Sequence, residues 1–199
     1  MSSLLKPAVF VACLLPFGGL VFGAAGNSLG PDPAEAIMHA SGEWALRLLL
    51  LALAVSPVRE LLGWRWPLSL RRMLGLYAFF YATLHLVTFS HFYLGWSGAI
   101  LLEELAERPY IAAGSLAWLL MLPLAVTSTR AMQRKLGRNW RKLHRAVYVA
   151  GVFACLHLAW QVRSDLGEPL AYGILLFLLL LWRLRVYSPR RFDVMRRRA

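Results

Sequence analysis

The sequence is short of charged residues and of cysteine. Only 16% of its 199 residues are charged and only ten are acidic, whereas 59% are hydrophobic and the mean hydropathy is +0.55. This composition excludes a water-soluble domain, which must cover its surface with polar residues, and favours a protein that lies in a lipid bilayer. The two cysteines, Cys13 and Cys155, lie in apolar runs without a Cys-x-x-Cys pattern. We therefore expect neither a disulfide framework nor a zinc site, and interpret both as small core residues.

Six apolar stretches are long enough to cross a bilayer, which takes about 20 helical residues. The predicted spans are residues 7–25, 44–61, 73–96, 110–128, 143–162 and 169–186. Arg47, Arg183 and Arg185 intrude on the second and sixth spans, but near their ends, where long side chains reach the headgroups. The pattern predicts an all-α membrane protein, a six-helix transmembrane bundle that forms a single domain over residues 1–199. No internal repeat is apparent.

The first stretch also has features of a secretory signal peptide. Lys6 precedes it, and small residues follow at 23–26. Its apolar run is longer than the usual ~7–15 residues of such peptides. We therefore expect a retained span.

Basic residues alternate between the connections. The net charge is +12 with a pI near 10.7, a balance that could indicate nucleic-acid binding. However, all but three of the 22 lysines and arginines lie on one side of the predicted bundle, the exceptions being Arg47, Arg108 and Arg163. All but two of the ten acidic residues lie near or on the other side. Because positively charged loops stay in the cytoplasm, both termini are expected inside, with no role in nucleic-acid binding.

Buried histidines are the most informative residues, since ionisable side chains in a membrane are costly and usually functional. His85 and His157 lie at the same depth, roughly 18–20 Å from the inner boundary when counted from Arg72 and Arg145 at about 1.5 Å per residue. Two neutral imidazoles at one depth on two helices can ligate a heme iron from both faces. Alternatively, they hydrogen-bond to other spans or line a proton path.

The other three histidines are less clear. His39 is expected in the first external loop, exposed to solvent, and His91 near the outer end of the third span as an interfacial residue rather than a ligand. His144 opens the predicted fifth span, about 20 Å from His157 and about 140° around a straight helix. It could serve a second redox site if that helix is distorted.

An anionic cofactor is another partner for His144. Arg141, Lys142 and Arg145 surround it in the sequence and could bind heme propionates or a flavin phosphate. The same basic cluster could instead face lipid headgroups.

Several short motifs resemble a known family in their order and spacing. They are Arg71-Arg72-Met73-Leu74-Gly75-Leu76, Phe79-Phe80-Tyr81-Ala82-Thr83-Leu84-His85, Arg108-Pro109-Tyr110-Ile111, Thr127-Ser128, Leu136-Gly137 with Trp140, and Leu143-His144-Arg145 with Tyr148. With them the chain resembles the MsrQ family, formerly YedZ, over nearly its whole length. That family belongs to the ferric-reductase-like transmembrane group, whose relatives include the membrane halves of NADPH oxidases and metalloreductases.

The resemblance implies a multi-pass protein of the bacterial inner membrane that binds heme b and FMN. It implies a heterodimer with MsrP, a periplasmic molybdopterin enzyme that reduces methionine sulfoxide in oxidised proteins. The chain would then be a redox subunit, and the sulfoxide chemistry would occur on its partner. By match to the family motifs, His85, His144 and His157 would be the heme-associated histidines. A second heme at His144 stays open, because the third span has no second histidine to oppose it.

The electron donor is also constrained by the resemblance. NADPH oxidases carry a dehydrogenase domain after the last span, but here only residues 187–199 follow, and no Gly-x-Gly-x-x-Gly loop occurs. Electrons are therefore expected from membrane quinol or from a cytosolic flavin reductase docking on the basic face. Two alternatives remain, namely a stand-alone b-type cytochrome or metalloreductase, and a transporter whose histidines relay protons.

Overall fold

The structure is a computed structural model that describes residues 4–64, 66–162 and 165–186. Every regular element in these ranges is helical, as the sequence predicts. The elements in chain order are α1 (Leu5–Ala25), α2 (Pro33–Leu62), the 3₁₀ helix η1 (Trp66–Ser69), α3 (Arg71–Phe92), α4 (Gly98–Glu107), α5 (Pro109–Val126), α6 (Arg130–Leu136), α7 (Arg138–Leu143), α8 (Ala146–Gln161) and α9 (Gly167–Val186).

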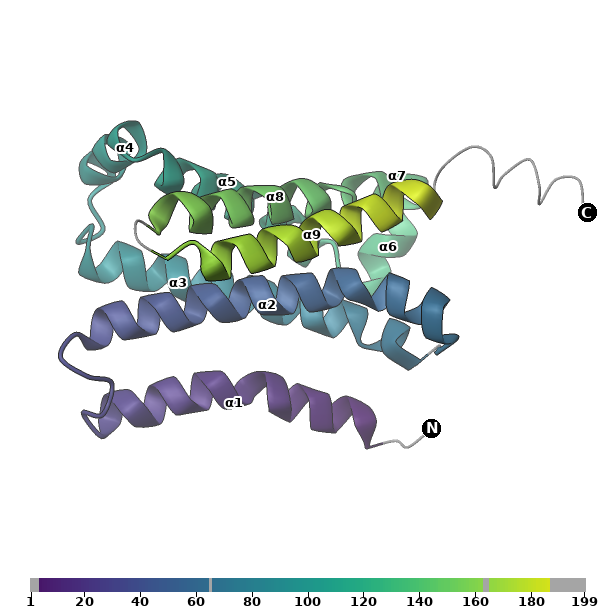
Figure 1. The fold of residues 1–199 in the computed structure, drawn as a ribbon, viewed down its shortest axis with the longest axis horizontal. Helices are drawn as coiled ribbons and strands as arrows, with labels where there is room; N and C mark the ends of the chain where they lie inside the picture. The colour runs from purple at the N-terminus through teal and green to yellow at the C-terminus, as the bar shows by residue number, and fades with distance from the viewer. Residues whose placement is uncertain (1–3, 65, 163–164, 187–199) are drawn as a thin grey trace, which may run out of the picture.

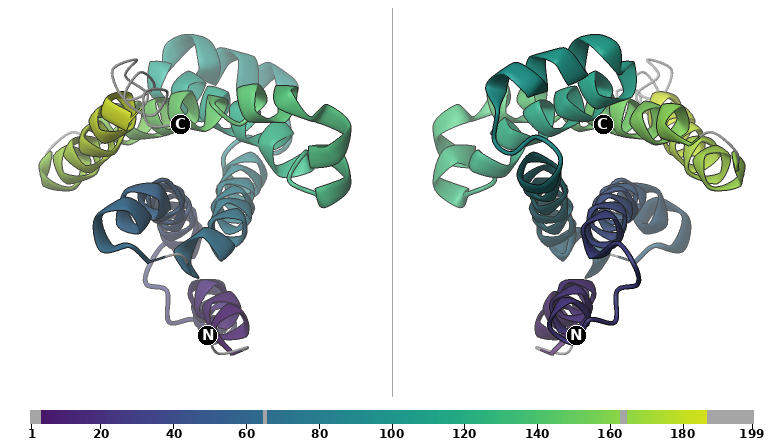
Figure 2. Two further views of the ribbon diagram at one scale, coloured as in Figure 1. Left: turned by 90° about the vertical axis from the view of Figure 1, so that its right-hand side faces the viewer. Right: turned by 90° about the vertical axis from the view of Figure 1, so that its left-hand side faces the viewer.

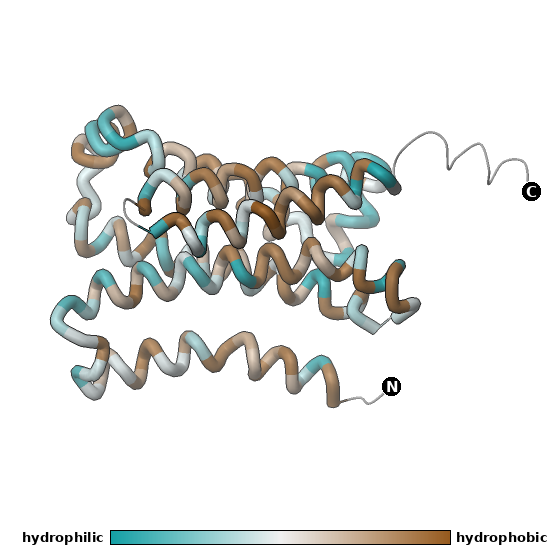
Figure 3. Tube along the Cα trace, viewed as in Figure 1, coloured by the Kyte–Doolittle hydropathy of each residue, from teal (hydrophilic) through white to brown (hydrophobic). Residues whose placement is uncertain are grey.

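The six longest of these helices run roughly along one axis and alternate in direction (Figure 1). One end of the bundle carries the α1–α2 loop and α4, which lies across the long helices (Figure 2). The other end carries η1, α6 and α7, beside the start of α1 and the end of α9. Polar residues gather at both ends, and apolar residues fill the length between them (Figure 3). From their side chains we call these the acidic end, with α4, and the basic end, with α6 and α7.

Five stretches of helix are long and apolar enough to cross a bilayer. They are α1, α3, α5, residues Arg138–Gln161 and α9. The remaining long helix, α2, is not among them, and its 30 residues include the charged Glu43, Arg47 and Arg59. The predicted second span is thus helical, while its crossing of the membrane stays a prediction.

Helix boundaries differ most from the predicted spans at two places. The sequence predicts a second span from residue 44, but α2 begins at Pro33, where the Asp32 carboxylate caps the helix by accepting the Glu35 N–H at 2.9 Å. The prediction that His39 lies in a loop is therefore wrong. The predicted fifth span is interrupted, because α7 ends at Leu143 and α8 begins at Ala146, which leaves His144 between two helices.

The bundle is built from two tightly packed helix pairs, α2 with α3 and α5 with α8, joined by a shared core. The core residues come from several of these helices and include Leu49, Tyr77, Ala78, Met121 and Ala150. Many large apolar side chains point away from it. Phe22 is 80% exposed and Leu184 71%, as expected of surfaces that face lipid.

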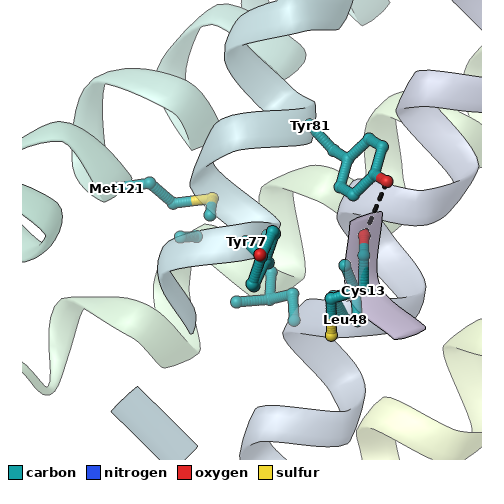
Figure 4. Close-up of a cluster of buried hydrophobic side chains, with 8 residues drawn as sticks. Cys13, Leu48, Tyr77, Tyr81 and Met121 are labelled. Atoms are coloured by element: carbon teal, nitrogen blue, oxygen red, sulfur yellow. Dashed lines mark hydrogen bonds between the residues drawn. The ribbon is translucent and has the colours of Figure 1, made fainter. Parts of the chain in front are cut away.

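Helix α1 is held to this body by two tyrosines of α3. The Tyr81 hydroxyl donates to the Cys13 carbonyl at 2.7 Å (Figure 4). It also accepts the Phe17 N–H at 3.0 Å. Tyr77 donates to the Phe10 carbonyl at 3.1 Å. Otherwise α1 lies along the side of the bundle with little of its surface buried (Figure 2). Two hydroxyl groups therefore supply much of the specific attachment of α1.

We predict that Tyr81→Phe loosens α1. The change removes the hydroxyl that bridges Cys13 and Phe17, and an unpaired polar group away from water costs about 1–3 kcal/mol. Cys13 is only 7% exposed. In a Cys155→Ser background, maleimide labelling of Cys13 in membranes should therefore become faster.

The matched control is Tyr93→Phe, because Tyr93 lies after the end of α3 and makes no hydrogen bond to α1. An unchanged labelling rate in Tyr81→Phe would contradict the attachment described above.

Candidate functional site

His85 of α3 and His157 of α8 come together in the bundle. Their ring centroids are 5.9 Å apart, and the ring planes cross at 83°. Both side chains are partly buried. The pair lies toward the acidic end, because the partner carbonyl of His157 belongs to Tyr110, the second residue of α5. The structure thus brings two histidines from the two helix pairs to one place.

Each ring is fixed by a backbone carbonyl of its own helix pair. Nδ1 of His85 lies 2.8 Å from the Met38 carbonyl of α2, and Nδ1 of His157 lies 2.7 Å from the Tyr110 carbonyl of α5. A carbonyl oxygen only accepts, so Nδ1 carries the proton and donates it in both cases. This tautomer leaves Nε2 with a free lone pair, which is the state in which an imidazole binds a metal.

The two hydrogen bonds reveal an internal repeat. Each joins residues 47 positions apart in the chain, one within the α2–α3 pair and one within the α5–α8 pair. The sequence analysis predicts no repeat, and on this point it is wrong. Matched segments are Ala82-Thr83-Leu84-His85-Leu86 with Ala154-Cys155-Leu156-His157-Leu158, and Leu62-Gly63 and Trp66 with Leu136-Gly137 and Trp140. These segments are the signal that could have revealed it.

The pair has the donor set and spacing for one metal ion. A metal–imidazole bond is about 2.0–2.1 Å long, so two rings on opposite sides of one ion have their centroids roughly 6.4 Å apart. The observed separation of 5.9 Å is close to this value. With only two histidine ligands, the remaining positions around the ion are open to a planar chelator, as in six-coordinate heme.

His144 lies apart from this pair, after α7 at the basic end. Its Nε2 is 3.1 Å from the Thr127 hydroxyl, which donates its own hydrogen to the Pro123 carbonyl at 2.6 Å. Nε2 of His144 must therefore be the donor, and Nδ1 keeps the free lone pair. Trp140 stacks on the ring at 4.0 Å and donates to the Thr127 carbonyl. His144 is thus held in the opposite tautomer to the other two candidates.

A cavity of about 620 Å³ opens beside His144, between α2, α3, α5 and α8. Apolar side chains such as Phe79 and Met121 line part of it. Seven arginines and lysines also line it, and no carboxylate of the described part of the chain does. The three basic residues expected to accompany an anionic cofactor, Arg141, Lys142 and Arg145, are among them. A cavity of this size and charge suits an anionic ring compound.

His39 and His91 have partners of their own near the acidic end. His39 of α2 is about half exposed and lies 3.7 Å from Glu35. His91, in the last turn of α3, accepts the Trp96 indole N–H at 3.2 Å. Sequence reasoning missed Met38, which immediately precedes His39 and whose carbonyl accepts the hydrogen bond from His85. A main-chain acceptor gives no signal in the sequence.

Comparison with known proteins identifies the family. Residues 41–155 match the model of the ferric reductase like transmembrane component. Three relatives carry the name protein-methionine-sulfoxide reductase heme-binding subunit MsrQ. One from Xanthomonas axonopodis pv. citri (strain 306) is 46% identical, with 89% of this chain and 84% of the relative covered. Those from Xanthomonas campestris pv. campestris (strain 8004) and Bordetella pertussis are 49% and 43% identical, with 79% and 94% of this chain and 72% and 92% of the relatives covered.

No solved structure matches the chain. The matches to the relatives nevertheless extend over most of its length and most of theirs. The chain therefore belongs to the MsrQ family of ferric reductase-like transmembrane proteins.

Proposed function

We propose that this chain is the heme-binding membrane subunit of a methionine-sulfoxide reductase system and carries electrons to its partner enzyme. The observation that supports this most is the His85–His157 pair, in which both Nδ1 atoms are occupied by carbonyls and both Nε2 atoms are free. The relatives are named as heme-binding subunits. No cysteine pattern for covalent attachment occurs, which argues against a c-type heme and is compatible with the heme b of the proposal.

His85 and His157 would be the axial ligands of that heme. When bound, the heme supplies a one-electron couple, and two histidine ligands leave no open position for substrate. The hydrogen bonds from Nδ1 to Met38 and Tyr110 raise the donor strength of each imidazole and fix the direction of Nε2. These bonds also argue against a proton relay, since a peptide carbonyl cannot pass a proton onward.

FMN and the electron donor belong to the basic end in this proposal. Arginine and lysine side chains of the 620 Å³ cavity would bind the phosphate, and the apolar wall would cover the ring. His144 would contact the same cofactor through Nδ1, or the propionates of a second heme. Quinol from the membrane or a cytosolic flavin reductase docking on the basic end would deliver the electrons.

The membrane topology follows from the charges. In the proposed arrangement α2 also crosses the membrane and brings the number of spans to six, residues 1–199 form one domain in the bacterial inner membrane, and both termini are cytoplasmic. The basic end then faces the cytoplasm and the acidic end the periplasm. The His85–His157 pair lies near the periplasmic end, where the electrons would pass to MsrP for the repair of oxidised periplasmic proteins.

The first test is heme content. Protein purified in detergent should show the oxidised and dithionite-reduced bands of a b-type cytochrome and a positive pyridine hemochrome assay. We expect His85→Ala and His157→Ala each to lose most of the heme, because one axial bond is removed. His39→Ala is the matched control and should keep it, since His39 pairs with Glu35 at the surface. Full heme in both deep variants would refute the ligand assignment.

The second test concerns the partner. Reduced protein mixed with purified MsrP should be reoxidised when a methionine-sulfoxide substrate is added, with the heme bands reporting the change. Without the sulfoxide, the bands should persist. If the heme stays reduced although MsrP is active with an artificial donor, the chain is a stand-alone cytochrome.

The third test concerns topology. Alkaline phosphatase and green fluorescent protein are fused in turn after residue 97 and after residue 199. Phosphatase activity is expected only at the first position and fluorescence only at the second, because only the first is periplasmic. An N-terminal tag should remain on the full-length protein. Its removal by signal peptidase would show that α1 is a signal peptide.

A further inference from the structure

Two glycines lie against the paired histidines. Gly42 of α2 and Gly114 of α5 each follow, by one helical turn, the residue whose carbonyl binds the ring, Met38 or Tyr110. A Cβ built on Gly42 would lie 3.0 Å from Nδ1 and 3.2 Å from Cε1 of His85. On Gly114 it would lie 2.7 Å from Nδ1 and 3.0 Å from Cε1 of His157. The same atoms are approached in both halves of the repeat.

We propose that Gly42 and Gly114 are positioning residues for the two heme ligands, an inference that rests on the proposed function. Each glycine lets an imidazole lie directly on the neighbouring helix, so that Nδ1 reaches a carbonyl one turn away. Any larger residue would push the ring off that surface. The glycines thereby set the hydrogen bond, the tautomer and the plane of each ligand without touching the metal.

At these contact distances, only glycine fits at either position without displacing the histidine ring. Ordinary van der Waals contact begins at 3.4 Å. If either glycine carried a Cβ, the neighbouring ring would therefore have to move, and the ring of His157 would have to move further than that of His85. A movement of several tenths of an ångström would stretch a hydrogen bond that is now 2.7 or 2.8 Å long.

None of the other helical glycines in the described residues lies against a histidine, although a Cβ on Gly23 or Gly151 would meet a leucine side chain closely. A Cβ on Gly75 of α3 or Gly173 of α9 would meet nothing within 4 Å. Alanine is the better helix former, so substitution at these open positions leaves the fold intact. The two glycines beside the histidines therefore differ from the rest in what they contact, and Gly173 provides a matched control.

The ring planes provide a spectroscopic readout. They cross at 83° in the structure. A low-spin ferric heme with nearly perpendicular imidazoles gives an electron paramagnetic resonance signal with one unusually large g value, whereas parallel rings give a rhombic signal. Displacing one ring alters this angle. It also weakens the Nδ1–H hydrogen bond, which lowers the donor strength of the ligand and raises the reduction potential.

The experiment compares Gly114→Ala, Gly42→Ala and the control Gly173→Ala, each purified in detergent and checked for folding by circular dichroism. Loss of an outer hydrogen bond of this kind weakens metal binding about 10-fold to 100-fold. We expect heme retention to fall within that range in Gly114→Ala, and less in Gly42→Ala. Any heme that remains should show a shifted g value and a higher potential. Gly173→Ala should match the unmodified protein in all three measurements.

A second readout does not depend on heme. In protein labelled with ¹⁵N-histidine, the imidazole shifts report which nitrogen carries the proton. Protonated Nδ1 is expected at His157 in the unmodified chain, and a mixture of tautomers in Gly114→Ala. If the unmodified protein bound no heme, the proposed function would fail while this tautomer comparison still decided the role of Gly114. Unchanged tautomer, g value and potential in folded Gly114→Ala would overturn the inference.

Discussion

The hydrogen bond from a histidine Nδ1 to a backbone carbonyl is the interaction on which the site depends. It occurs twice, from His85 to Met38 and from His157 to Tyr110, and it ties α3 to α2 and α8 to α5. Within a bilayer no water is present to replace such a bond, so the helix pairs must keep their register for it to persist. The same bond directs both free nitrogens away from the supporting carbonyls. The packing of the helix pairs and the orientation of the two imidazoles therefore have one cause.

The sequence predicts the helical fold well because its dominant signal, long apolar runs, can be recognised directly in the sequence. Its errors occur where charged and apolar residues share a helix. The first turns of α2 contain Glu35 and His39, which read as a loop although Asp32 and Pro33 are ordinary helix-start residues. α4 and α6 lie in connections whose composition is polar or basic, and each begins with a serine or threonine cap. Hydropathy alone overlooks such short helices.

The candidate site could be predicted only in part from the sequence, for a different reason. Depth counting pairs His85 with His157 because both follow an arginine at the membrane edge by a similar number of residues. The rest of the site consists of two carbonyls and two glycines, and these have no side-chain chemistry to recognise. The repeat leaves only short matches in the sequence, such as those around His85 and His157, and matches this short are easily taken for chance. Three-dimensional contacts were needed to show that the 47-residue spacing occurs twice.

The two halves of the repeat diverge at the basic end, and this divergence explains the different character of the two ends. At the acidic end each half contributes one histidine. At the basic end one half contributes His144, while the start of α3 contributes Arg71 and Arg72, both of which line the cavity. None of the five histidines in the sequence opposes His144 from α3. A ligand there must be held largely by charge, whereas one between His85 and His157 can be held by two metal–nitrogen bonds. The two halves of the repeat thus place unlike side chains at the two ends of the bundle, an arrangement that suits the electron transfer proposed above.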